Sequence, residues 1–534
     1  MPKTVKTYCR NCTSHCGLEF EVENNRLVGL RGDRDHLMTS GYFCVKANAS
    51  LDLGEGNYAR LTDNLKRNVS GDFEAIDKQR AFAEIAARIR ALVDEFGPRS
   101  VGIFYGTGSY FNGLSWPLMK SFLCELGSPN LFSTMTIDQS ARWVASLRMG
   151  TMATGSYAID GLDALMLVGK NPVVSHQLIG CFRPGRALTE LRRRGAELIV
   201  VDPRNTETAR HASQHLALKP GEDAALFAGM IRLVLAQGWE DRAFCARHVE
   251  GVDALRQAVD PFTPERVEQR AGIAPAQLRE ATRVFATAPK SLAVVGTGPC
   301  MGPHSNLNVH LVECLNALCG NYPRAGDPVA NRSVLFPRAF VESAVPPNRT
   351  WESGVKCHSV DTGQLYGELP TGALPDEILT PGNHRIRALI VLGGNPLTAL
   401  GQPEKTLRAF SGLDLLVSID PRMTDTARLS HYVLAPKLQY ERHDLSTVLD
   451  GIAGYTQPFV QYTAPVVEAP DTVVDEGEFF WELARRLGLQ LRYKKMILGM
   501  DYHQLGAGQT VDMEIMPGGE QLARWWCEGT GISL

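Results

Sequence analysis

The chain has 534 residues, which is too long for one hydrophobic core and predicts about three or four domains. Its hydrophobic fraction of 44% is ordinary for a globular protein, so several cores can form. The formal net charge of −3 leaves no basic excess for neutralising phosphates, which argues against a nucleic-acid partner. No stretch of about 18 uncharged apolar residues occurs, so a direct membrane span is not expected.

The first residues contain neither an apolar signal core nor a twin-arginine leader, which predicts a cytoplasmic location. Cytoplasmic cysteines stay reduced. The twelve cysteines of the chain are therefore expected as thiols or metal ligands, and a cluster of them indicates metal binding before disulfide formation.

Four cysteines near the N-terminus form such a cluster. Three lie within eight residues in the pattern C-x2-C-x3-C, and the fourth returns later in the chain: Cys9, Cys12, Cys16 and Cys44. This spacing is typical of the corners of a 4Fe-4S cube. Structural zinc more often uses two separated C-x2-C pairs, although zinc and unliganded thiols remain alternatives on spacing alone. Alternating residues around Asn24 and Asn25 predict a hairpin, and hence a small N-terminal β unit.

The middle of the chain contains one sequence pattern twice. Each copy begins with an apolar run that ends in Gly-x-Asn-Pro, at 164–172 and at 388–396. Each continues to a second apolar run that ends in Asp-Pro-Arg, at 198–204 and at 415–422. In the first copy a helical segment, 186–194, lies between the two runs. Strand–helix–strand order predicts parallel sheets with right-handed crossovers, so we expect two related α/β domains of the dinucleotide-binding kind.

Polar residues occupy matching places at the ends of these predicted strands. Ligands of parallel sheets bind outside the carboxyl ends of the strands, where glycine permits close approach and arginine can pair with phosphate. Asn-Pro and Asp-Pro are also common turn formers without any ligand. Turn formation does not require the two copies to match, so the match favours a nucleotide-like ligand. The candidate ligand-binding residues are Gly169, Asn171, Asp202 and Arg204 in the first copy, and Gly394, Asn395, Asp420 and Arg422 in the second.

These features together resemble the molybdopterin oxidoreductase family, which includes formate dehydrogenases, periplasmic-type nitrate reductases and dimethyl sulfoxide reductases. The resemblance runs in collinear order from Cys9 to about Asp444. It implies that the four cysteines hold a 4Fe-4S cluster and that two molybdopterin guanine dinucleotides hold molybdenum or tungsten. It also implies two-electron oxidation or reduction of a small molecule, with electrons relayed through the cluster to a redox partner protein or an electron-transfer subunit.

The resemblance assigns roles to further residues. Lys46 matches the family lysine between cluster and pterin, and Ala47 replaces the glycine that follows it. Arg142 lies in a segment that resembles the approach to the metal ligand. His304 and His310 are better explained as structural residues than as part of a substrate funnel. Cofactor contacts are implied for Lys46, Gly169, Asn171, Pro172, His176, Asp202, Arg204, Thr206, Gly221, Asp223, Gly298, Gly394, Asn395, Asp420 and Arg422.

The sequence departs from the family pattern at the metal. Val144 stands where nitrate reductases and formate dehydrogenases have cysteine or selenocysteine, and a valine cannot bind the metal. Ala145 replaces the histidine that follows in formate dehydrogenases. Formate oxidation by the usual arrangement is therefore not expected, and Val144 leaves the metal with an open position. The resemblance also implies a C-terminal domain that covers both pterins, and we expect these 534 residues to lack it.

We expect three structural units. A cluster domain spans 1–60 and is completed by 437–534, a first α/β cofactor domain spans 144–329, and a second combines 61–143 with 330–436. Two other functions remain open: a cluster-carrying subunit with a degenerate pterin site, as in respiratory NADH dehydrogenase, and a non-redox enzyme of the hydratase type that uses the metal as a Lewis acid.

Overall fold

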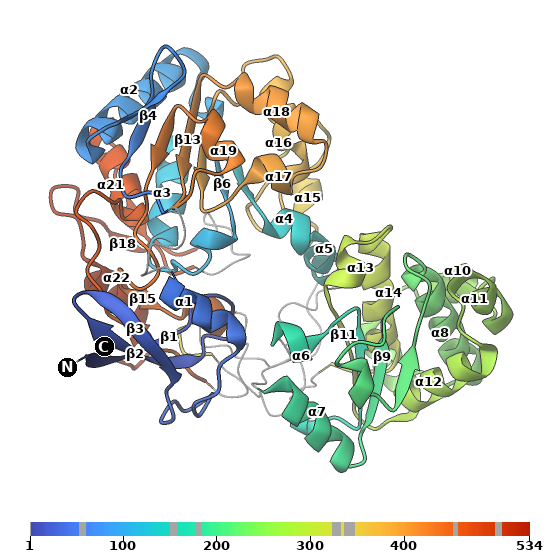
Figure 1. The fold of residues 1–534 in the computed structure, drawn as a ribbon. Coiled ribbons are helices and arrows are strands. Elements are labelled where there is room, and N and C mark those ends of the chain that lie inside the picture. The colour runs from blue at the N-terminus through green and yellow to red at the C-terminus, as the bar shows by residue number, and fades with distance from the viewer. Residues whose placement is uncertain are drawn as a thin grey trace.

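The computed structural model describes residues 2–52, 60–149, 159–176, 183–322, 333–335, 348–451, 458–496 and 505–534. The described residues form a three-stranded antiparallel sheet, a four-stranded sheet, a seven-stranded sheet and two short two-stranded sheets. Helices cover the two larger sheets, and the small N-terminal sheet lies beside them (Figure 1). The chain is thus a mixed α/β protein with parallel sheets, as predicted.

The N-terminal sheet has the strand order β1-β2-β3 and consists of β1 (Lys3–Tyr8), β2 (Gly17–Glu23) and β3 (Arg26–Gly32). Asn24 and Asn25, between β2 and β3, have φ angles of 49° and 60°. Two consecutive residues in this left-handed region are what a tight two-residue hairpin turn requires. The predicted hairpin is therefore confirmed.

A small hydrophobic core lies under this hairpin. Leu18 and Phe20 of β2 and Leu27 of β3 are buried and pack against Tyr440 and Val466. Part of the chain beyond residue 437 therefore closes the N-terminal unit. Residues further along, in α21 (Glu476–Leu487) and α22 (Gly519–Cys527), pack instead into the core of the seven-stranded sheet.

The four-stranded sheet is parallel throughout, in the order β10-β9-β8-β11. All five residues of its inner strand β8 are buried, as the continuous apolar run predicted. The predicted helix at 186–194 is confirmed as α7. Helix α7 covers one face of the sheet, and α8, α12 and α14 cover the other. The elements are β8 (Ala164–Val168), β9 (Glu197–Val201), β10 (Gln214–Leu216), β11 (Ser291–Val295), α7 (Pro184–Arg193), α8 (Asp223–Gln237), α12 (Pro275–Thr287) and α14 (Ser305–Leu318).

The seven-stranded sheet has the order β5-β4-β14-β13-β12-β6-β7, and only β4 and β5 run antiparallel to their neighbours among its described strands. Helices α2, α3 and α21 pack on one face, and α16 and α18 on the other. The elements are β4 (Leu65–Arg67), β5 (Phe73–Ala75), β6 (Val101–Tyr105), β7 (Leu131–Ser133), β12 (Ala388–Leu392), β13 (Leu415–Ile419), β14 (Tyr432–Leu434), α2 (Lys78–Phe96), α3 (Trp116–Leu126), α16 (Leu374–Leu379) and α18 (Pro403–Ser411).

The two large sheets share one core arrangement. The order β10-β9-β8-β11 corresponds strand for strand to β14-β13-β12-β6. The fourth strand of each sheet lies on a different side of its repeat in the chain. Strand β11 follows the first repeat, which begins at β8, whereas β6 comes long before the second repeat, which begins at β12. The internal repeat therefore includes a fourth strand, β6 or β11, which the sequence comparison did not reveal because the two strands occupy different positions in chain order.

The remaining helices and strands connect these units. Helix α5 packs against α14 and lies between the two large sheets (Figure 1). None of the described helices has the length and apolarity to cross a lipid bilayer. The connecting elements are α1 (Ala49–Asp52), α4 (Met135–Asp138), α5 (Ser140–Met149), α6 (Pro172–Ser175), α9 (Arg242–His248), α10 (Val252–Val259), α11 (Pro264–Ala271), α13 (Thr297–Met301), α15 (Thr350–Ser353), α17 (Pro396–Ala399), α19 (Asp425–Leu429), α20 (Thr447–Gly451), β15 (Asp444–Leu445), β16 (Tyr462–Thr463), β17 (Arg492–Tyr493) and β18 (Gln509–Thr510).

A buried carboxylate ties the seven-stranded sheet to α4. Glu368 is fully buried and accepts hydrogen bonds from the hydroxyls of Tyr105 and Ser133. The ammonium of Lys120, which is 5% exposed, lies 3.9 Å from the same carboxylate. Ser133 in turn accepts a hydrogen bond from the backbone N–H of Met135, the first residue of α4, at 3.0 Å. Glu368 thus helps to fix the segment that leads into α5.

Replacing this carboxylate should destabilise the fold. Glu368→Ala is expected to lower the free energy of unfolding by ~3–5 kcal/mol, because the Lys120 cation would lose a buried counter-charge. Glu352→Ala is the matched control, since Glu352 is 56% exposed in a surface pair with Arg349 and its loss should change stability by less than about 0.5 kcal/mol. Thermal unfolding followed by circular dichroism measures both variants. Equal midpoints for the two would contradict the role of Glu368.

Candidate functional site

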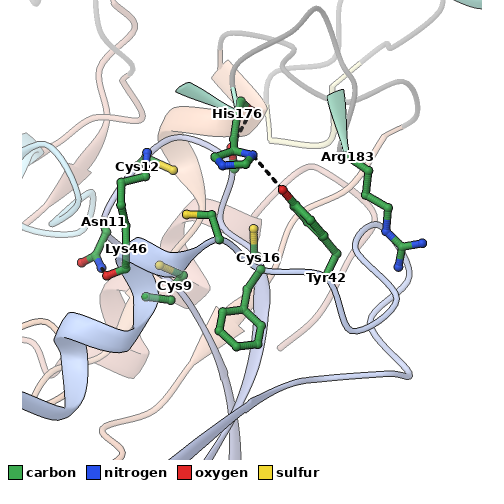
Figure 2. A pocket seen from close by; sticks show the side chains of 12 residues that line it. Cys9, Asn11, Cys12, Cys16, Tyr42, Lys46, His176 and Arg183 are labelled. Carbon is green, nitrogen blue, oxygen red and sulfur yellow. Dashed lines mark hydrogen bonds between the residues drawn. The ribbon is translucent and has the colours of Figure 1, made fainter. Parts of the chain in front are cut away.

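The four cysteines of the N-terminal cluster line one cavity (Figure 2). Cys9 directly follows β1, and Cys12 and Cys16 lie on the loop that leads into β2. Cys44 precedes a short 3-10 helix, η1 (Val45–Asn48). The backbone N–H of Cys9 donates to the carbonyl of Cys16 at 2.8 Å, which closes the loop on itself. The fold therefore brings together all four residues that the sequence singled out.

The cavity is electrostatically suited to bound iron. Burial is the main cause that raises the pKa of Cys9 to about 12, and the neighbouring Cys12 and Cys44 add to the rise. Burial also raises the pKa of Cys16, again with contributions from the other cysteines. Neighbouring thiolates in a buried cavity repel one another, and positively charged iron removes that repulsion. The donor set consequently fits a 4Fe-4S cluster.

The first α/β unit supplies one wall of this cavity. The hydroxyl of Tyr42 is hydrogen-bonded to Nδ1 of His176 at 2.8 Å, as Figure 2 shows. The hydroxyl of Ser14 donates to the carbonyl of His176 at 3.1 Å. The guanidinium of Arg183 lies 5.7 Å from the centre of the Tyr42 ring. His176 was expected at a phosphate-binding loop, but its imidazole ring is hydrogen-bonded to Tyr42 of the cysteine unit.

Lys46 lies on η1 and lines the same cavity. Its carbonyl accepts a hydrogen bond from the side-chain amide of Asn11 at 3.1 Å, which holds η1 against the cysteine loop. Burial and, secondarily, the Lys46 charge lower the pKa of His176. The lysine side chain is therefore close to both the cysteines and the loop that follows β8.

Glycines bring the loops at the carboxyl edge of the four-stranded sheet into contact. Gly169 follows β8 with a φ of 56°, and a Cβ on it would lie closer than 3.0 Å to the Pro299 ring. A Cβ on Gly296, after β11, would clash with the carbonyl oxygen of Gly169. The N–H of Gly298 donates to that same carbonyl at 3.3 Å. Such an approach requires residues without a Cβ.

The two repeated asparagines make equivalent contacts. Oδ1 of Asn171 accepts a hydrogen bond from the Thr208 hydroxyl at 2.6 Å. Oδ1 of Asn395 accepts one from the Thr426 hydroxyl at 2.8 Å. In both copies the amide nitrogen donates to a neighbouring carboxylate. Each asparagine thus ties the loop after the first strand of its repeat to the loop after the second, and Pro172 and Pro396 begin the short helix that follows.

The Asp-Pro-Arg ends also match in detail. The carboxylate of Asp202 accepts a hydrogen bond from the N–H of Arg204 at 2.9 Å, and Asp420 accepts one from Arg422 at 2.9 Å. The hydroxyl of Thr206 then accepts from the N–H of Ala209 at 3.1 Å. Burial raises the pKa of Asp420 to about 6, against the opposing effect of the Arg422 N–H.

A turn of the first α/β unit approaches this edge from the side. Gly221 has a φ of 87°, and a Cβ on it would lie 3.6 Å from the ring of Pro303 in the loop beyond α13. Asp223 begins α8, and burial together with the nearby Asp202 carboxylate raises its pKa. The turn, the β9 loop and the β11 loop therefore share one region.

The loop after β6 in the seven-stranded sheet corresponds to the loop after β11, and the sequence did not predict it as part of the site. The N–H of Gly106, after β6, donates to the carbonyl of Leu392 at 2.7 Å, and the N–H of Gly108 donates to Gly393 at 2.9 Å. These bonds repeat those that the first sheet makes through Gly296 and Gly298. The signal was present as a repeated Gly-Thr-Gly, at 106–108 and 296–298. Gly394, which was named instead, packs against Gly106.

Arg142 also reaches the edge of the first sheet. Its guanidinium donates to the carbonyl of Val295, the last residue of β11. Burial raises the pKa of the nearby Cys300, and Arg142 opposes that rise. Burial, followed by the Arg142 charge, lowers the pKa of Lys170 to about 8. Lys170 and Cys300 were not predicted as site residues, because their burial and their nearness to Arg142 arise only from the fold.

The position expected for a metal ligand carries an apolar side chain. Val144 lies on α5 and packs against the cluster of Trp143, Leu147 and Leu365. Ala145 is 1% exposed and belongs to the core of the four-stranded sheet. Neither can bind a metal.

The two histidines considered earlier lie on or next to α14. His304 is its N-cap, with a φ of 58°, and Nε2 of His310 lies 3.5 Å from Sγ of Cys314.

The chain was compared with known proteins and structures. Formate dehydrogenase H of Escherichia coli (strain K12) is 27% identical over 523 residues, which cover 92% of this chain and 69% of that protein. The periplasmic nitrate reductase of Desulfovibrio desulfuricans is 24% identical over 530 residues, covering 91% of this chain and 66% of the relative. The solved structure of acetylene hydratase from Pelobacter acetylenicus superimposes with a TM-score of 0.76 at 25% identity, covering 91% of this chain and 69% of that one.

Two family models match almost the whole chain. The molybdopterin oxidoreductase model matches residues 60–469, and the molybdopterin oxidoreductase Fe4S4 domain matches residues 2–55. The resemblance noted in the sequence is thereby confirmed. The chain belongs to the molybdopterin oxidoreductase family and is an enzyme of that family, with a 4Fe-4S cluster and a molybdenum or tungsten pterin as its cofactors.

Proposed function

We propose that the chain catalyses the two-electron oxidation or reduction of a small molecule at a metal held by two pterin guanine dinucleotides, one at the carboxyl edge of each large sheet. The observation that carries this proposal is the matching set of hydrogen bonds at the two edges, in which the Thr208 hydroxyl donates to Asn171 and the Thr426 hydroxyl donates to Asn395. A site that had lost one dinucleotide would have no need to keep both sets.

Different residues at each edge would bind different parts of the dinucleotide. The glycine contacts hold the loops close, so that backbone N–H groups can approach a diphosphate. Arg204 and Arg422 follow the strand ends and can pair with phosphate oxygens. The carboxylates of Asp202, Asp223 and Asp420 can accept hydrogen bonds from the N–H groups of guanine. When bound, the pterin-held metal supplies the exchange of electrons with the substrate.

We assign the cluster to Cys9, Cys12, Cys16 and Cys44, and the passage of electrons between pterin and cluster to the neighbourhood of Lys46. The lysine lines the cysteine cavity, and its charge helps to lower the pKa of His176 in the first α/β unit. A fixed ammonium between two redox centres favours electron density passing between them. A redox partner protein or further subunit would then receive the electrons.

The same observations suggest how the chain is divided. We propose a cluster domain of 1–60 completed by the part of 437–534 that precedes α21, a first cofactor domain of 144–329, and a second of 61–143 with 330–436 on which α21 and α22 pack. The shared core of Leu18, Phe20 and Tyr440 supports the first assignment. The corresponding strand orders of the two large sheets support the other two.

Val144 implies that the metal receives no thiolate from α5. We propose that Arg142, held through its bond to the Val295 carbonyl, together with Lys170 keeps this side of the site positively charged. Positive charge at this place can hold an anionic part of the cofactor or the substrate.

A second candidate function is hydration without net electron transfer. The structural similarity to acetylene hydratase favours it. Turnover that proceeds without any electron acceptor would support hydration, whereas turnover that requires one supports the redox function.

The cysteine assignment predicts which cysteines retain iron. Cys12→Ser is expected to lower the iron content from about four atoms per chain, because serine is a poor ligand for the cube, and to abolish the paramagnetic signal of the reduced cluster. Cys124→Ser is the control, since Cys124 lies on α3 outside the cavity. Iron analysis and electron paramagnetic resonance on protein purified without oxygen measure both. A Cys12→Ser protein with full iron and an unchanged signal would overturn the assignment.

If each large sheet binds one dinucleotide at its carboxyl edge, a substitution at one edge should release only the dinucleotide bound there. Arg204→Ala and Arg422→Ala should each weaken one of two dinucleotides by about 1.5–3 kcal/mol, the usual contribution of a hydrogen bond to a charged group. Guanine released by acid after long dialysis should fall from about two towards one per metal in each variant, and further in the double variant. Arg186→Ala, whose side chain is 68% exposed on α7, should retain both. The proposal fails if the unaltered protein releases one guanine or none.

A further inference from the structure

Arg10 is a fully buried arginine between two of the cysteines assigned to the cluster. Its side chain is 0% exposed. The guanidinium lies 5.6 Å from the centre of the Tyr8 ring and 5.1 Å from that of Tyr440. Its Nη1 donates to the carbonyl of Arg442 at 3.3 Å and lies 3.8 Å from the carboxylate of Asp444, which is 3% exposed.

The positive charge of Arg10 is only partly compensated. Nε and Nη2 are buried and have no hydrogen-bond partner among the described residues. The 3.8 Å separation from Asp444 is longer than the ~2.7–2.9 Å of a hydrogen-bonded ion pair. A charge held in this way, away from water, projects its potential further than a surface charge does.

Further charges extend this group into the seven-stranded sheet. Arg442 is 7% exposed and donates to the carbonyls of Lys437 and Phe111 at 3.3 and 3.2 Å. Glu476, on α21, is 5% exposed and accepts from the Asn112 amide at 2.8 Å. The group thus contains two buried arginines and two buried carboxylates, and Arg10 is the member that lies next to Cys9 in the chain.

We propose that Arg10 is a fixed buried cation that raises the reduction potential of the cluster. Asp444 is the counter-charge that limits this rise. The added electron makes the cluster more negative, and a nearby cation in a medium of low dielectric constant stabilises that state. The Arg10–Asp444 pair would thereby set how readily the cluster accepts electrons from the pterin. The inference rests on the proposed cysteine ligation.

An alternative is that Arg10 only joins the N-terminal unit to the rest of the fold. The two roles differ in what a change of charge does. A purely structural arginine would affect stability and cluster retention, but would leave the potential of a retained cluster where it was. The reduction potential is therefore the deciding measurement.

The test is a redox titration of the intact protein, purified without oxygen and followed by electron paramagnetic resonance. Arg10→Met removes the charge, and the ratio of reduced to oxidised cluster at a fixed potential should fall about tenfold, or ~59 mV for one electron. Arg10→Lys keeps the charge and should restore most of the shift. Asp444→Asn should move the potential in the opposite direction. Arg34→Met removes an exposed charge from the same unit and should change nothing, because solvent screens it.

Iron content and signal shape first establish that each variant has kept its cluster. An unchanged potential in Arg10→Met, with the cluster retained, overturns the proposal. If Arg10→Met loses its cluster, Asp444→Asn decides, and a potential that does not rise overturns it. Retention of the cluster by Cys12→Ser would overturn the cysteine assignment and this inference together, which separates that failure from a failure of Arg10 alone.

Discussion

Contact between glycines at neighbouring strand ends is the constraint on which the site depends. In the first sheet Gly296 meets Gly169, and in the second Gly106 meets Gly393, each at a distance that no larger residue tolerates. Because the strands are parallel, every loop that carries polar side chains leaves from the same edge. The asparagine bridges then join adjacent loops in both sheets. These contacts fix both the approach of the backbones and the placement of the asparagine side chains.

The cysteine unit is anchored to both large units. The His176 contacts with Tyr42 and Ser14 join it to the first sheet. The buried Arg10 donates to the carbonyl of Arg442, whose own guanidinium donates to the carbonyl of Phe111 in the second unit. A relay of electrons needs fixed distances between its centres, and a unit attached on two sides supplies them. In the proposal made above, the polar contacts that hold the cysteine loop are also those that adjust the potential of the cluster.

Local patterns predicted the elements but not all of their neighbours. The apolar runs that became β8 and β12, the helix α7 and the cysteine spacing are visible in short stretches of sequence, and the structure contains each of them. Strand β6 was missed because its partner β12 lies far along the chain, so no local pattern reveals the pairing. Arg10 looks like a surface residue in the sequence, and only the fold shows that it is buried.

We propose that two sheet edges and one cysteine loop together enclose a single chain of redox centres. Anomalous X-ray diffraction from crystals of the protein purified without oxygen, at the iron edge and at the molybdenum and tungsten edges, tests it most directly. We expect iron within the cavity of Cys9, Cys12, Cys16 and Cys44, and one heavier metal between the carboxyl edges of the two large sheets, near Val144. Zinc at the cysteines, or a heavier metal elsewhere in the molecule, would contradict it.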